Sequence, residues 1–81
     1  MNKKIMHVLT DYISAYEKYK DYLENKVLIN RLTKVYNELL SVAEKHAHSY
    51  NDFEKECTEK KIFEKFDKAI KQCRKEFDKL L

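Results

Sequence analysis

The sequence predicts an all-α fold, an up-down-up bundle of three helices, and three observations support this prediction. The 81 residues include no glycine and no proline, the residues that tight turns between strands usually require. Charged residues make up 38% of the chain, with lysine and glutamate abundant, as is typical of helices. Apolar residues recur at alternating spacings of three and four, which places them on one face of a helix. We therefore expect one helical domain over residues 1–81.

The first helix is expected to begin near residue 3, after Asn2, a residue type that often caps helix N-termini. Its apolar face consists of Ile5, Leu9, Tyr12, Tyr16, Tyr19 and Leu23. Four tyrosines fall within residues 12–22, and each carries a hydroxyl that needs water or a hydrogen-bonding partner. This face is expected to lie partly in the core and partly at its edge.

The segment expected to form the second helix shows the same alternating three- and four-residue spacing of apolar side chains. Its apolar face consists of Leu28, Leu32, Val35, Leu39, Val42 and His46. Between Leu23 and Leu28 the spacing jumps to five, which predicts a turn at residues 24–26. Asn25 is the residue there best able to adopt a left-handed conformation. The alternative is one continuous helix from about residue 3 to 47 with a local change of phase.

The third helix shows a seven-residue repeat. Its apolar face consists of Phe63, Phe66, Ile70, Cys73, Phe77 and Leu80. The apolar phase changes again between residues 57 and 63, where Thr58 is a candidate cap for a new helix. Residues 51–57 are therefore expected to form either a separate short helix or a kinked first turn of the third one.

The start of this last segment offers two alternative N-terminal caps. Ser49 precedes Asp52 by three positions, and Asn51 precedes Glu54 by three positions, the spacing of a capping box.

A chain of this size gains only about 3–5 kcal/mol of net stability from one core. We therefore expect a partner protein, or self-association into a homo-oligomer, to provide additional burial.

The charge balance and the cysteines suggest a cytoplasmic protein. The net charge is +3, from 17 basic and 14 acidic residues, which is a mixed surface. The apolar run after the first residues is too short for an export signal, and no segment is long enough to span a membrane. Cys57 and Cys73 are therefore expected to be free thiols in a reducing compartment.

The histidines and cysteines show no pattern of a metal or catalytic site, so we expect no cofactor, no metal and no enzymatic activity. His46 and His48 are two residues apart and point in nearly opposite directions on a helix. No C-x-x-C or H-E-x-x-H pattern occurs. His46 is expected at the core edge near a helix C-terminus, and Cys73 as a small apolar core residue.

The function that remains is binding of another protein, as an inhibitor, adaptor, chaperone or immunity-type factor. The predicted contact residues are edge positions of the first two helices: Tyr12, Tyr22, Tyr36 and Arg31. Aromatic side chains and arginine carry most of the binding energy at protein interfaces. Alanine at Tyr12 or Tyr22 is expected to weaken the complex while leaving the melting temperature nearly unchanged.

The alternative function is non-specific binding of nucleic acid through the third helix. The residues that would contact phosphates form one outer line: Lys61, Lys65, Lys68, Lys75 and Lys79, interrupted by Gln72. A solvent-exposed face is the preferred explanation of this line, because it lies opposite the apolar face, its charge is nearly all lysine, and no aromatic side chain lies between the lysines to stack bases. The neighbouring flank from residue 60 to 78 mixes acidic and basic residues at helical spacing, so we expect ion pairs there.

Overall fold

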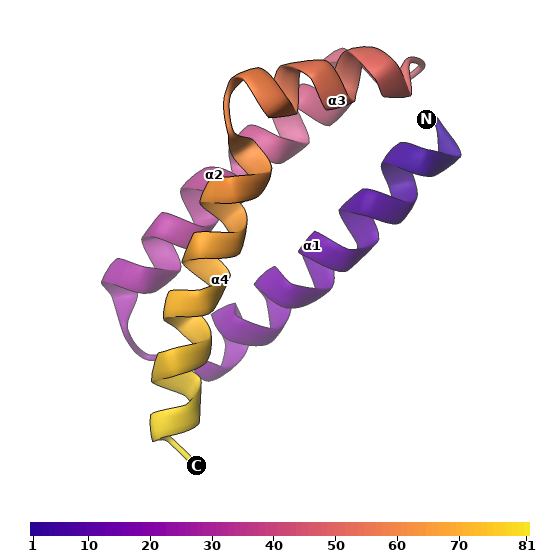
Figure 1. Cartoon of the computed structure of the whole chain (residues 1–81). Coiled ribbons are helices and arrows are strands. Elements are labelled where there is room, and N and C mark those ends of the chain that lie inside the picture. The colour runs from indigo at the N-terminus through magenta and orange to yellow at the C-terminus, as the bar shows by residue number, and fades with distance from the viewer.

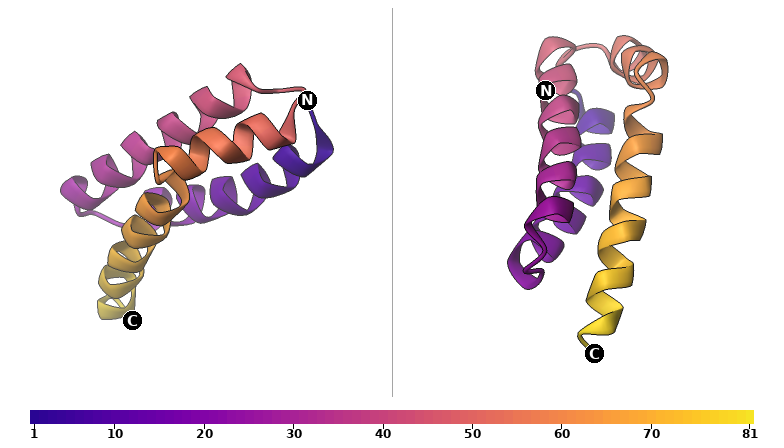
Figure 2. Two further views of the ribbon diagram at one scale, coloured as in Figure 1. Left: turned by 45° about the horizontal axis from the view of Figure 1, so that its top comes forward. Right: turned by 90° about the vertical axis from the view of Figure 1, so that its left-hand side faces the viewer.

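Four α-helices make up the chain, and the computed structural model describes all of residues 1–81. They are α1 (Lys3–Tyr22), α2 (Lys26–Lys45), α3 (Tyr50–Glu59) and α4 (Ile62–Lys79). α1 and α2 form an antiparallel hairpin, and α4 runs back beside them toward the α1–α2 turn (Figure 1). The short α3 packs across the end of α2, so α3 and α4 together form the third limb of an elongated bundle measuring 40 × 21 × 15 Å (Figure 2). The predicted helical bundle is confirmed, with the separate short helix longer than expected.

The predicted turn between the first two helices is confirmed, and the single long helix is wrong. α1 ends because Leu23 adopts an extended conformation, with φ −96° and ψ 143°. Asn25 is not left-handed, since its φ is −72°, and it acts instead as the N-cap of α2. Its side-chain oxygen accepts hydrogen bonds from the backbone N–H groups of Val27 and Leu28, at 3.1 and 3.3 Å. Asn2 caps α1 in the same way, as predicted.

The boundaries of α3 and α4 differ in part from the expectation. Ser49 is the N-cap of α3 and accepts a hydrogen bond from the Asp52 N–H at 3.4 Å, whereas Asn51 already lies inside the helix. Thr58 also lies inside α3 and starts no helix. The bend instead occurs at Lys61, the N-cap of α4, which is left-handed with φ 56°. That conformation costs a non-glycine residue about 1–2 kcal/mol. The packing of α3 and α4, the helices on either side of Lys61, holds the bend in place.

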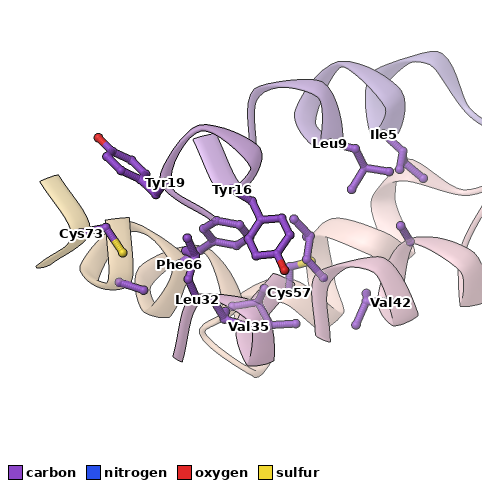
Figure 3. Close-up of a cluster of buried hydrophobic side chains, with 14 of the residues drawn as sticks. Ile5, Leu9, Tyr16, Tyr19, Leu32, Val35, Val42, Cys57, Phe66 and Cys73 are labelled. Atoms are coloured by element: carbon purple, nitrogen blue, oxygen red, sulfur yellow. The ribbon is translucent and has the colours of Figure 1, made fainter. Parts of the chain in front are cut away.

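The core is one cluster of 16 buried side chains drawn from all four helices (Figure 3). α1 and α2 bury most of their predicted apolar faces, but the buried line of α4 is rotated from the expected one. It consists of Ile62, Phe66, Ala69 and Cys73, of which Phe66 and Cys73 are buried as predicted. The residues of the predicted seven-residue repeat are half-buried at Phe63, Ile70 and Phe77, and Leu80 is 63% exposed. α4 contacts α1 and α2 at once, so it buries a wider stripe than one heptad line.

An ion-pair cluster connects the end of α2 to α3. The Glu56 carboxylate lies 2.9 Å from the Lys45 Nζ, 3.0 Å from the His46 Nε2 and 3.1 Å from the Lys60 Nζ. His46 is the C-cap of α2 and half-buried, the position predicted for it. Hydrogen bonds from Lys45, His46 and Lys60 lower the pKa of Glu56 to about 2. The charged carboxylate therefore links α3 to the C-terminus of α2.

This cluster predicts an acid-dependent loss of stability. A carboxylate whose pKa is lower in the folded state stabilises the fold above its ordinary pKa and loses that effect as it is protonated. Wild-type protein is therefore expected to lose stability as the pH falls from about 4.5 to about 2. Glu56→Gln should flatten this part of the curve in urea unfolding followed by circular dichroism. The exposed Glu59→Gln is the control, and an equal effect of both changes would contradict the prediction.

Candidate functional site

Tyr12 lies in the contact between α1 and α4. Its ring centroid is 4.6 Å from that of Phe66 and 5.6 Å from that of Phe63. The hydroxyl donates a hydrogen bond to the Asp67 carboxylate at 3.4 Å. Burial, followed by the charge of Asp67, raises the pKa of Tyr12 to about 12. The ring is thus half-buried, with only part of it at the surface.

Tyr36 lies in a different contact, between α1 and α2. Its ring stacks on the buried ring of Tyr16, with centroids 4.0 Å apart and planes 14° apart. The Tyr16 hydroxyl shares a hydrogen bond with the Thr33 hydroxyl at 3.0 Å. Figure 3 shows Tyr16 within the core, while the Tyr19 hydroxyl points away from it. The tyrosine-rich stretch therefore contributes side chains to the core as well as to the surface.

The four predicted contact residues do not form one patch. Arg31 lies on the α2 side facing α4, where its Nη1 donates to the Gln72 carboxamide at 3.5 Å. Tyr12 lies between α1 and α4, and Tyr36 between α1 and α2. Tyr22 lies at the last residue of α1 and is 65% exposed. These four residues occupy three different helix–helix contacts and one end of the bundle.

Tyr22 belongs to an exposed apolar surface at that end, which we call the apolar end. It consists of the exposed side chains Tyr22, Leu80 and Leu81 and of the half-buried ring of Phe77, which Tyr22 contacts. The Tyr22 and Phe77 rings meet edge to face at 6.1 Å, and the Lys18 ammonium lies 5.1 Å from the Phe77 centroid. The surface therefore combines the exit of α1 with the last turn of α4.

The predicted lysine line of the third helix is not uniform. Lys61 is the left-handed N-cap, and Lys79 pairs with Glu76 in its own helix at 3.4 Å. Lys65 pairs with Glu38 of α2 at 3.5 Å. Lys68 and Lys75 have no carboxylate within 4.0 Å. Only the middle of the line resembles a free basic surface.

The structure instead assembles a basic surface from α4 and α2 that the sequence did not reveal. Two neighbouring depressions, of about 440 and 360 Å³, share Lys68 and Gln72 in their linings. We call the surface around them the basic face; it consists of Arg31, Lys34, Lys65, Lys68, Lys71, Arg74 and Lys75. Because the buried line of α4 is rotated, Lys65, Lys68 and Gln72 border α2. The expected ion pairs of Lys71 and Arg74 along their own helix are not formed, since no carboxylate lies within 4.0 Å of either.

Both cysteines are buried and unpaired. Burial raises the pKa of Cys57 to about 11, and it also raises that of Cys73. A thiol that stays protonated is a poor nucleophile, so these side chains act as apolar packing. No three His, Cys, Asp or Glu side chains are grouped closely enough to hold a metal ion.

Comparison of the chain with family models, with curated proteins and with solved structures finds no match. None of the four helices has the length and apolar character that crossing a bilayer requires. The two surfaces defined above, the apolar end and the basic face, are therefore the features from which a function can be argued.

Proposed function

We propose that this chain is a non-enzymatic module that binds another protein through the apolar end. The observation that supports the proposal is the exposure of large apolar side chains where α1 and α4 end: Tyr22 at 65%, Leu80 at 63% and Leu81 at 91%, with Tyr22 contacting Phe77. Contiguous exposed apolar surface on a small domain marks sites of protein–protein contact. Tyr22 and Phe77 supply aromatic rings, the side chains that most often carry binding energy.

The proposal covers the roles of inhibitor, adaptor, chaperone or immunity-type factor, because each acts by occupying a surface of another protein. It also includes a cytoplasmic location, which agrees with two cysteines that are buried and unpaired. Self-association is the variant of this proposal in which a second copy covers the apolar end. An aromatic and leucine surface of this kind suits either occupant.

Tyr22 tests the proposal better than the other predicted contact residues. Tyr12 and Tyr36 pack their rings on Phe66 and Tyr16, so alanine there changes the fold and the binding surface together. Most of the Tyr22 ring is in solvent, so Tyr22→Ala should change stability by no more than about 0.5 kcal/mol. Its effect on a complex can therefore be measured on a folded protein.

The expected result of Tyr22→Ala is a loss of affinity of about 30-fold, the size of an interface hot spot. The immobilised chain is used to capture the partner from an extract of the cells in which the chain is naturally produced. The affinity is then measured by calorimetry on the purified pair. Sedimentation velocity of the free chain tests self-association with the same variants. The matched control is Met6→Ala, which removes an apolar side chain of similar exposure near the other end of α1. Unchanged binding by Tyr22→Ala, or an equal loss with Met6→Ala, would contradict the proposal.

A further inference from the structure

We propose that the basic face binds the phosphate backbone of a nucleic-acid duplex without reading its sequence. This inference does not depend on the apolar end and adds a second binding activity. It uses two neighbouring helices, α2 and α4, rather than the single lysine line visible in the sequence.

The first argument is that positive charge is concentrated on this surface. Seven basic and two acidic residues line its two depressions, giving the surface a net charge of +5. The whole chain carries +3, so the remaining ten basic and twelve acidic residues sum to −2. Both arginines of the chain, Arg31 and Arg74, belong to the basic face. The protein is thus an almost neutral body with one strongly cationic side, which steers anions to that side.

The second argument is that most of these cations have no carboxylate partner within the fold. Among the seven cations only Lys65 has a carboxylate within 4.0 Å, which is Glu38. The two arginines are held by neutral groups, Arg31 by the Gln72 carboxamide and Arg74 by the Tyr19 hydroxyl. Of the ten cations outside the basic face, three have a carboxylate within 4.0 Å, namely Lys45, Lys60 and Lys79. The six cations without a carboxylate partner lie on neighbouring parts of α2 and α4 and repel one another, and an external polyanion relieves that repulsion.

The composition of the basic face favours phosphate over an acidic protein or a lipid surface. The depression on α4 has no apolar lining residue, and the one shared with α2 has only Val35 and Ala69. Those two side chains are already 95% and 91% covered by the fold, at 5% and 9% exposure. Protein interfaces need an apolar centre, and interfacial membrane helices need an apolar face. A phosphate backbone needs only cations.

The same composition predicts which nucleic acid is bound and how. The basic face carries no aromatic side chain, so it offers nothing on which unstacked bases can lie. Five of its seven cations are lysines, which act on phosphate as point charges and lack the rigid fork with which arginine makes bidentate contacts. Lys65 and Lys75 are separated by about 15 Å of helix, which is about four steps of a duplex strand. We therefore expect backbone contacts along one side of a duplex.

The experiment measures fluorescence anisotropy of labelled 20-base-pair DNA and RNA duplexes with the full chain, between 50 and 200 mM salt. Wild-type protein should bind duplexes of different sequence equally and lose affinity with a slope of log K against log salt of about −3 to −5. Lys68→Glu combined with Lys75→Glu should lower affinity at 50 mM salt at least tenfold and reduce the slope by about 2. Circular dichroism verifies that this double variant, and the control variant described next, are folded.

The control carries the same change of net charge elsewhere. Lys3→Glu combined with Lys26→Glu places carboxylates in the first turns of α1 and α2, where the helix dipole favours them. This variant should keep most of the wild-type affinity. Equal loss in both double variants, or no loss with Lys68→Glu and Lys75→Glu, would overturn the proposal. Tighter binding to poly-L-glutamate or to vesicles with 30% phosphatidylserine than to either duplex would also overturn it. Tyr22→Ala should leave duplex binding unchanged, so this test is independent of the apolar end.

Discussion

Phe66→Ala is expected to remove most of the stability of the protein. Phe66 is 0% exposed and lies in the centre of the core, against Tyr12 of α1. Truncating a buried phenylalanine to alanine costs about 3–5 kcal/mol, through lost burial and the cavity left behind. That cost equals the net stability of about 3–5 kcal/mol expected for a single core of this size. A large fraction of the variant should therefore be unfolded at 25 °C.

Urea unfolding followed by circular dichroism measures this effect, and the wild-type chain provides the reference. Phe66→Leu is the matched control, because leucine keeps most of the volume and should cost less than about 1.5 kcal/mol. A Phe66→Ala variant that unfolds at nearly the wild-type urea concentration would contradict the central packing of α4 against α1.

Tyr12→Ala is expected to lower stability by about 2 kcal/mol, because the ring packs on Phe63 and Phe66. For a chain of this length that corresponds to a fall of about 10 °C in melting temperature. The contacts thus revise the expectation from sequence, which placed this side chain at an edge with little influence on folding. Thermal unfolding by circular dichroism measures the change.

Two further variants separate the causes of this effect. Tyr12→Phe keeps the ring and removes only the 3.4 Å hydrogen bond to Asp67, so the melting temperature should change little. Tyr22→Ala removes a ring that is mostly in solvent and should also have little effect. A small effect of Tyr12→Ala itself would mean that the ring is not held between α1 and α4.

The apolar end and the basic face both involve α4, but they use different parts of it. Phe77 lies in its last turn and Leu80 is its C-cap, whereas the basic face extends from Lys65 to Lys75. A protein partner at the apolar end would leave most of the basic face open to solvent. Binding of a protein and binding of a duplex are therefore compatible with each other in this geometry.

Much of the fold follows from the sequence because it depends on interactions within a few residues. The three-and-four spacing of apolar side chains located the helices, and it gave the buried residues Leu9, Leu39 and Phe66. Asn2 was predicted as a cap and Ser49 was one of two candidate caps, because a cap is a bond between residues two or three positions apart. The break after Leu23 was visible as a change of phase in the same local pattern.

What the sequence alone did not decide depends on contacts between helices far apart in the chain. The bend lies at Lys61 and not at Thr58, because packing of α3 and α4 on the first two helices holds a strained residue in place. α4 touches α1 and α2 together, and its buried line is rotated so that Ile62 and Ala69 are buried in place of Phe63 and Ile70 of the seven-residue repeat. That rotation brought Lys65 and Lys68 beside Arg31, a neighbour 34 or more positions earlier. Periodicity fixes which side of each helix is apolar, but the rotation of one helix against two others is set by the packing of all three. The surfaces that carry function are therefore decided by the tertiary structure.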